Sequence, residues 1–146
     1  ELKSDERQVL IAMRELLLKH AWIDSAAGDQ DHSELPVPGI SVISFVAEQV
    51  VAAREILPEL TMHGLLVIQP TQDAIEFCLQ HGIQGFLPYF GALDPNIVAA
   101  AQRAGLYVGA WGLEEPEQLA GALSLGISGV TVNWPTEALE KLAQLT

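Results

Sequence analysis

Residues 105–135 read GLYVGAWGLEEPEQLAGALSLGISGVTVNWP and decide the fold class. Residues 107–111 and 129–132 are short apolar runs typical of buried strands, and the residues between them predict a helix. Pro116, preceded by two glutamates, opens that helix, and Gly126 ends it. Two strands joined by a helix over about 20 residues form a βαβ unit, so the sequence predicts a parallel sheet.

The rest of the chain repeats this alternation of strands and helices. Further strands are predicted at residues 40–45, 64–68 and 86–90. Further helices are predicted at about residues 5–20, 46–57, 71–81 and 95–104, and from 135 onward. Residues 24–39 combine small, acidic and proline residues and predict an irregular surface loop.

Glycine recurs where a predicted helix gives way to a strand. Gly64, Gly82, Gly105 and Gly126 lie 18, 23 and 21 residues apart, close to the length of one βα repeat with short loops. The tripeptide ELK at residues 1–3 looks like the end of a further strand, which gives six strands alternating with six helices. This order predicts a parallel α/β fold. A doubly wound sheet usually carries a G-x-G-x-x-G loop, which this sequence lacks, whereas six units of a (β/α)₈ TIM barrel fit the chain.

Composition narrows the function classes. The 146 residues suit one domain, and 49% apolar residues are enough for a core. The net charge of −12 disfavours nucleic acid and anionic membrane surfaces as partners. Cys78 cannot form an internal disulfide and is expected to be an inert core residue. No run of about 18 apolar residues and no leader is present, so we expect no membrane span and a cytoplasmic location.

The carboxyl ends of parallel strands form the functional edge of such folds. The residues that leave the predicted strands there are Glu1, Lys3, Ser44, Phe45, Gln69, Tyr89, Phe90, Trp111, Asn133 and Trp134. None of the four histidines is in this set, and no G-x-S-x-G motif is present, so the residues predict neither a catalytic histidine in this chain nor a serine hydrolase.

The Glu1–Lys3 pair and Trp111, both at this edge, each allow two interpretations. Glu1 and Lys3 are two residues apart, so an extended backbone turns both toward the same face. A carboxylate beside an ammonium suits a hard divalent cation next to a phosphate, and the alternative is two solvated charges at a frayed terminus. Trp111, among small neighbours, is either a pocket wall that stacks on a ligand or a core residue.

Several stretches, taken in order, resemble a known family. They are ELK at 1–3, SVISF at 41–45 followed by AREILPEL and GLL, AAAQRAGLYVGAW at 99–111, and LGISGVTVNWP at 125–135. This order resembles the glycerophosphodiester phosphodiesterase family from its third strand to its end, over essentially the whole chain. The resemblance implies a (β/α)₈ TIM barrel, here strands 3 to 8 with the first two βα units absent. Residues 1–146 would then be a single, incomplete phosphodiesterase domain.

The resemblance also implies an activity and site residues. The reaction is metal-assisted hydrolysis of a glycerophosphodiester to glycerol 3-phosphate and an alcohol. Glu1 would bind the divalent cation, Mg²⁺ or Ca²⁺, and Lys3 would act as a catalytic residue against the phosphate. The substrate-binding residues would be Ser44, Phe45, Tyr89 and Trp111, of which Tyr89 is assigned from its place at a strand end.

Departures from the family pattern matter as much as the matches. After Trp111 the family usually has threonine, valine and asparagine, whereas residues 112–114 are GLE, and its final threonine-aspartate-x-proline is VNWP at 132–135. The histidine-arginine pair, the glutamate-x-aspartate pair and the second histidine of the family's first two strands are not in this sequence. We therefore expect this chain to be inactive alone, with a missing N-terminal segment or a homo-oligomer completing the barrel. The alternative is a catalytically inactive partial-barrel binding or assembly module.

Overall fold

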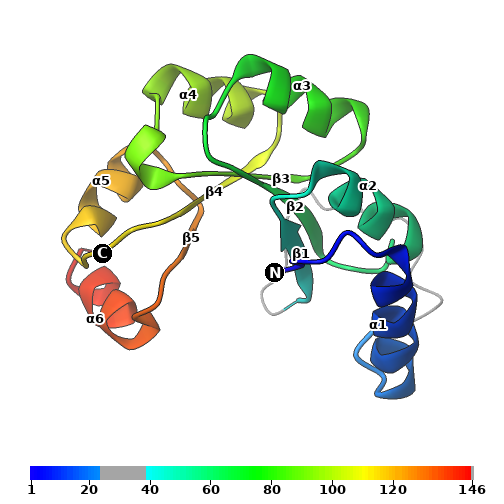
Figure 1. The fold of residues 1–146 in the computed structure, drawn as a ribbon. Helices are drawn as coiled ribbons and strands as arrows, with labels where there is room; N and C mark the ends of the chain where they lie inside the picture. The colour runs from blue at the N-terminus through cyan, green and yellow to red at the C-terminus, as the bar shows by residue number, and fades with distance from the viewer. Residues whose placement is uncertain (24–38, 146) are drawn as a thin grey trace.

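The computed structural model describes residues 1–23 and 39–145. Its helices and strands alternate along the chain as the sequence predicts (Figure 1). They are α1 (Arg7–Lys19), β1 (Ser41–Ser44), α2 (Ala47–Ile56), β2 (Met62–Val67), α3 (Gln72–Gln80), β3 (Gly85–Pro88), the 3₁₀ turn η1 (Phe90–Ala92), α4 (Pro95–Arg103), β4 (Tyr107–Trp111), α5 (Gln118–Ser124), β5 (Gly129–Thr131) and α6 (Pro135–Leu145). The loop predicted at 24–39 lies, apart from its last residue, outside the described residues.

The five strands form one parallel sheet in which spatial order equals chain order, β1-β2-β3-β4-β5. The predicted strand end at residues 1–3 is confirmed as a sixth position, because Leu2 forms a parallel bridge with Ser44. The Leu2 N–H donates to the Ile43 carbonyl at 2.8 Å, and the Ser44 hydroxyl donates to the Leu2 carbonyl at 2.8 Å. Strands added one after another in chain order build a barrel rather than a doubly wound sheet.

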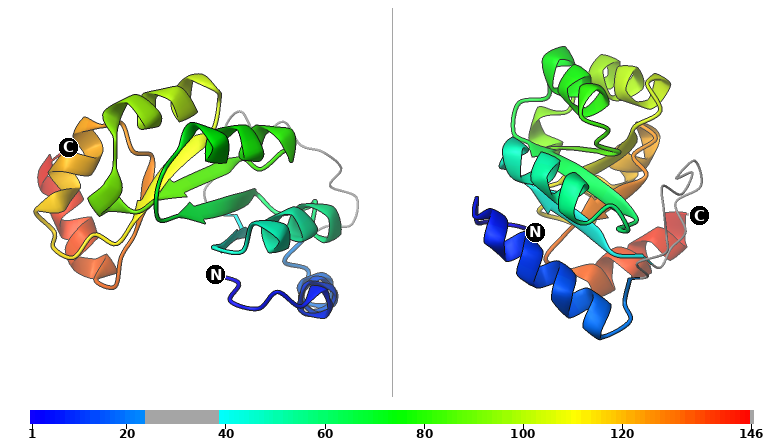
Figure 2. Two further views of the ribbon diagram at one scale, coloured as in Figure 1. Left: turned by 45° about the horizontal axis from the view of Figure 1, so that its top comes forward. Right: turned by 90° about the vertical axis from the view of Figure 1, so that its right-hand side faces the viewer.

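The sheet curls into an arc with helices on its convex side (Figure 1). The two ends of the arc, at α1 and at α6, stand apart in Figure 1 and in the left view of Figure 2. The partial (β/α)₈ barrel predicted from the sequence is therefore confirmed.

The main core lies between the sheet and the helices. Phe86 and Val108 are fully buried there, and they belong to one cluster with Val50, Ile75 and Val98 from α2, α3 and α4. Successive residues of β2 and β3 are buried on both faces of the sheet, which explains why these strands read as continuous hydrophobic runs.

The concave face of the sheet is built from large side chains beside glycines. A Cβ atom on Gly64 would lie 2.4 Å from Leu87 Cδ1, and one on Gly109 would lie 2.9 Å from Leu87 Cδ2. At Gly129 the Cβ would lie 1.9 Å from the Tyr107 hydroxyl. Leu87 and Tyr107 thus occupy space that only glycine leaves open on the neighbouring strands.

Three of the four repeated glycines end a helix as predicted. Gly82, Gly105 and Gly126 have φ values of 64°, 81° and 71°, the left-handed conformation common at helix C-termini. The interpretation of Gly64 was wrong, because β2 already begins at Met62 and Gly64 lies inside the strand. Its role is close packing against Leu87, which helix-end reasoning could not anticipate.

Two predicted helix starts differ in outcome. Helix α4 begins at Pro95 as predicted, and the Asp94 side chain caps it by accepting a hydrogen bond from the Asn96 N–H at 2.8 Å. The start of α5 at Pro116 was wrong, since this helix begins at Gln118. The Gln118 side-chain oxygen accepts the N–H of Glu114 at 2.6 Å, which holds the preceding residues in a turn.

Within the described ranges, no helix is long and apolar enough to cross a bilayer. Cys78 is fully buried, and burial raises the pKa of its thiol to about 11. A buried thiol with a high pKa is unreactive, which agrees with the predicted packing role.

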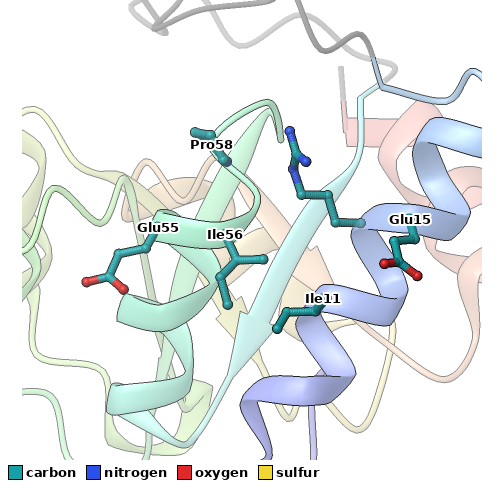
Figure 3. A pocket seen from close by; sticks show the side chains of 6 residues that line it. Ile11, Glu15, Glu55, Ile56 and Pro58 are labelled. Carbon is teal, nitrogen blue, oxygen red and sulfur yellow. The ribbon is translucent and has the colours of Figure 1, made fainter.

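A groove of about 420 Å³ lies between α1 and α2, on the outer side of the arc (Figure 3). It is lined by Ile11, Arg14, Glu15, Glu55, Ile56 and Pro58. Two ion pairs join α1 to α2 and to the segment after it. Arg7 contacts Glu55 at 2.9 Å, and Arg14 contacts Glu59.

Glu59 is the buried member of the second ion pair. Its side chain is 4% exposed, and its Oε2 atom has no hydrogen-bond partner within the described structure. Burial alone would raise the pKa of Glu59, but the hydrogen bond from Arg14, a backbone hydrogen bond and the Arg14 charge hold this pKa below its usual value of 4.5. Because the folded pKa is depressed, the ionised pair stabilises the fold above about pH 4.5 and this contribution is lost as the pH falls through the folded pKa.

Arg14→Met is expected to lower the free energy of unfolding at pH 7 by about 1–3 kcal/mol, because it leaves the Glu59 carboxylate buried and unpaired. The difference from the parent chain should shrink at a pH below the lowered folded pKa of Glu59, because the carboxyl is then protonated in both proteins. Urea unfolding at the two pH values measures this. Arg7→Met is the matched control, since Arg7 and Glu55 are 59% and 58% exposed and their pair contributes about 0–1 kcal/mol. An equal loss for Arg14→Met at both pH values would contradict the account.

Candidate functional site

A pocket of about 290 Å³ opens on the carboxyl side of the strands. Its walls come from the ends of the Leu2 strand, β1, β2, β4 and β5, so residues far apart in sequence meet there. The lining residues are Glu1, Ile43, Phe45, Leu66, Trp111, Gly112, Leu113, Thr131, Val132 and Asn133. A pocket at this edge is where a parallel barrel places its active site.

Three of the predicted substrate-binding residues form one aromatic cluster at this edge. Phe45 and Trp111 are perpendicular, with ring centroids 5.0 Å apart and an interplanar angle of 89°. Tyr89 packs on Trp111, with ring centroids 4.9 Å apart and an interplanar angle of 43°. The strand ends thus bring these three rings together although 66 residues separate the first from the last. Trp111 packs on Tyr89 and lines the pocket, and its stacking on a ligand stays a prediction.

Glycines make room for Tyr89. A Cβ atom on Gly112 would lie 2.5 Å from Tyr89 Cε2, and one on Gly91 would lie 2.6 Å from Tyr89 Cε1. Gly112 also has a φ of 79°, which disfavours any other residue. Tyr89 is therefore held between two glycines, and its contact with Trp111 restricts the position of the Trp111 ring.

Ser44 has a different environment from the other predicted residues. It is fully buried, its hydroxyl donates to the Leu2 carbonyl, and the same oxygen accepts the Val46 N–H at 3.1 Å. It does not line the pocket described above. Its observed contacts join the first strand to β1, immediately before Phe45.

Glu1 and Lys3 are adjacent, as their spacing predicts. The Lys3 ammonium lies 3.0 Å from Glu1 Oε1, and the two side chains are 79% and 32% exposed. Glu1 lines the pocket and Lys3 does not. Nowhere among the described residues do three or more His, Cys, Asp or Glu side chains gather in a way that could hold a metal ion. A Ca²⁺ or Mg²⁺ ion takes six or more oxygen ligands, so the described residues do not complete such a site and Glu1 can supply only part of it.

Several pocket residues were missed by sequence reasoning. Ile43, Leu66 and Leu113 are apolar and resemble core residues in the sequence, so no signal marked them. Thr131 carried one usable signal, since it lies two residues before Asn133, and alternate strand residues face the same side. Trp134, which leaves the last predicted strand, packs against the main core cluster.

The fold and the pocket define a partial parallel barrel with a cleft at its carboxyl edge, and comparison with known proteins supplies the family. Residues 31–137 match the model of the "Glycerophosphoryl diester phosphodiesterase family". The chain belongs to this family, as its sequence resemblance predicts. A comparison with curated proteins gives no match.

Solved structures of phosphodiesterases have a similar fold. A phosphodiesterase from Oleispira antarctica, in complex with the product sn-glycerol-3-phosphate, superposes with a TM-score of 0.75 at 20% identity, over 94% of this chain and 50% of its own. A candidate enzyme of the family from Galdieria sulphuraria gives 0.72 at 16% identity, over 97% and 55%. Another from Silicibacter pomeroyi gives 0.64 at 25% identity, over 72% and 38%. The chain thus spans between 38% and 55% of the length of these structures.

Gly112→Ala is expected to displace Tyr89 and with it the Trp111 ring. The added Cβ meets Tyr89 at 2.5 Å, and the backbone strain adds about 1–2 kcal/mol of destabilisation. Near-ultraviolet circular dichroism should report the changed aromatic cluster. Gly105→Ala is the control, because Gly105 has a similar φ of 81° but nothing within 4 Å of an added Cβ. Identical aromatic spectra for the two variants would argue against the packing role of Gly112.

Proposed function

We propose that this chain is part of a phosphodiester hydrolase of the glycerophosphodiester phosphodiesterase type. The observation that carries the proposal is the pocket itself, in which Glu1, Phe45 and Trp111 meet at the carboxyl edge of a barrel of this family. The completed enzyme would cleave a glycerophosphodiester to glycerol 3-phosphate and an alcohol. Residues 1–146 are then one incomplete barrel domain.

Each site residue has a proposed role that follows from its chemistry. Glu1 would offer a carboxylate oxygen to a divalent cation, Mg²⁺ or Ca²⁺, which would polarise the phosphate when bound. Lys3 would turn from Glu1 to the phosphate and neutralise its charge. Phe45, Tyr89 and Trp111 would shape the substrate pocket, and Ser44 would position Phe45 through its buried hydroxyl.

The described part of the pocket lacks the histidines that the family resemblance implies for acid and base catalysis. No histidine lines it, and His63 is fully buried at the opposite, amino end of β2. In the described sheet the Leu2 strand and β5 each pair on one side only. Two further βα units inserted between them would close the ring and could bring the missing acid, base and metal ligands to the same edge. We therefore propose that the chain alone is inactive.

A hydrolysis assay tests the proposed function. Glycerophosphocholine, with Mg²⁺ or Ca²⁺ present, should be cleaved by a longer chain that places two βα units from the Oleispira antarctica phosphodiesterase before Glu1, and not by the 146 residues alone. Lys3→Met in the longer chain should lower kcat by about 10²–10³-fold. Lys19→Met is the control, since Lys19 lies in the last turn of α1. If the longer chain folds but has no metal-dependent activity, this function is wrong.

The second candidate function is a catalytically inactive partial barrel that binds or assembles through its free edges. The one-sided pairing of the Leu2 strand and β5 favours it, because an unpaired strand edge is a template for another strand. Light scattering of the purified 146 residues should then show dimers or higher oligomers. A monodisperse monomer without partner strands would remove edge-driven assembly.

A further inference from the structure

Two buried polar side chains hydrogen-bond to the first segment of the chain, from Leu2 to Glu6. Ser44 and Gln49 are 0% and 2% exposed, and a polar side chain buried so completely costs folding free energy unless it is hydrogen-bonded. The Ser44 hydroxyl donates to the Leu2 carbonyl at 2.8 Å, and the Gln49 side-chain amide donates to the Glu6 carbonyl at 3.3 Å. Both buried groups therefore hold main-chain atoms of the same segment, one at each end.

Ser44 and Gln49 belong to one rigid part of the fold. Ser44 is the last residue of β1, and Gln49 is the third residue of α2. The Val46 N–H donates to the Ser44 hydroxyl oxygen at 3.1 Å, and the Val46 carbonyl accepts the Val50 N–H at 3.1 Å. The strand end is thus hydrogen-bonded to the start of the helix, so the main chain fixes the spacing of the two donors.

The hydrogen bond from Gln49 comes before the packed part of α1. Glu6 is the N-cap of this helix, and its side chain makes no cap hydrogen bond. The residues between Glu6 and Leu10 are exposed, and Leu10 is the first fully buried residue of α1. The Arg7–Glu55 ion pair joins α1 to α2 in this stretch, but both side chains are exposed, and such pairs stabilise little. The Glu6 main chain therefore depends on Gln49 for a buried contact.

Lys3 lies between the two carbonyls that are held in this way. Its side chain is 79% exposed, and its ammonium lies 3.0 Å from Glu1 Oε1. An exposed lysine side chain is long and flexible, so the region its ammonium reaches depends on where the main chain places its Cα atom. Misplacing a group that acts on a substrate by about 1 Å costs about 10²-fold in rate.

We propose that Gln49 is a positioning residue for Lys3. Together with Ser44 it holds the main chain on both sides of Lys3, so that the ammonium starts from a fixed point at the pocket edge. The effect on catalysis rests on the function proposed above, which places Lys3 against the phosphate. The holding of the first segment depends only on the two hydrogen bonds.

Backbone ¹⁵N relaxation of the 146-residue chain tests this holding without hydrolysis. The amides of Lys3, Ser4 and Asp5 should give order parameters of about 0.85 in the parent chain and below about 0.6 in Gln49→Met, the values of rigid and flexible main chain. Methionine has nearly the length of glutamine but no N–H donor, so the change removes the hydrogen bond and keeps the packing volume. Equal order parameters in the two chains would overturn the proposal.

Gln102→Met is the matched control for this measurement. The Gln102 amide also donates to a main-chain carbonyl, that of Gly126 at 2.7 Å, but the residue lies in α4. The order parameters of residues 3–5 should therefore keep the parent values in this variant, and an equal fall would contradict a specific role of Gln49. Gln49→Asn, whose amide is one methylene too short to reach Glu6, takes the place of Gln49→Met if that variant does not fold.

A double-mutant cycle in the longer chain described above separates positioning from general stability. Gln49→Met alone should lower kcat for glycerophosphocholine about tenfold, less than Lys3→Met, because the ammonium is displaced rather than removed. In a chain that already carries Lys3→Met, the same change should leave kcat unaltered, since Gln49 acts through Lys3. Equal losses of kcat from Gln49→Met in both backgrounds would show a merely structural role and overturn the proposal.

The two experiments distinguish failure of this proposal from failure of the proposed function. Lower order parameters in Gln49→Met, together with a folded longer chain that has no metal-dependent activity, would leave the holding of the first segment standing and remove the enzyme. Unchanged order parameters and unchanged kcat in an active longer chain would remove the positioning role and leave the enzyme.

Discussion

Parallel strand pairing is the constraint on which this structure depends. Each strand is followed by a helix that returns the chain to the amino end of the sheet, so the carboxyl ends of all the strands fall on one edge. Among the described residues, β1, β2, β3 and β4 are paired on both sides, whereas the strand at Leu2 and β5 are paired on one side only. Curvature and one-sided pairing at both ends are what a ring of strands shows when it is not closed.

The inner face of the arc shows how a pocket arises from this arrangement. Gly64 and Gly109 leave space that Leu87 fills, which packs the middle of the concave face. Toward the carboxyl edge the alternate residues are the large rings of Tyr89 and Trp111, which pack on each other, and Trp111 also contacts Phe45 at the end of β1. The cavity therefore depends on which residues occupy the concave face at each level of the sheet. In the middle of the sheet, glycines leave room for one large side chain, and at the carboxyl edge the packed rings form a wall.

The sequence could predict the parts of the structure that depend on order and local chemistry. Strand–helix alternation predicted the partial barrel, and strand ends predicted that Phe45, Tyr89 and Trp111 lie near one another, because parallel strands end at one edge. It could not distinguish Leu66, which lines the pocket, from Phe86, which is buried under the helices, since both are apolar strand residues. The role of Gly64 and the late start of α5 depend on contacts with Leu87 and Gln118 that no periodicity reveals.

The Ser44 hydroxyl contacts both the first strand, through the Leu2 carbonyl, and the residue after Phe45, through the Val46 N–H. Its side chain thus couples strand pairing at the edge of the arc to the position of the aromatic wall. Folding of the edge and shaping of the pocket are then cooperative rather than separate events. Any strand that docks beside Leu2 stabilises the hydrogen bonds on which the position of Phe45 depends. Pairing of that strand and formation of the pocket wall are therefore thermodynamically coupled.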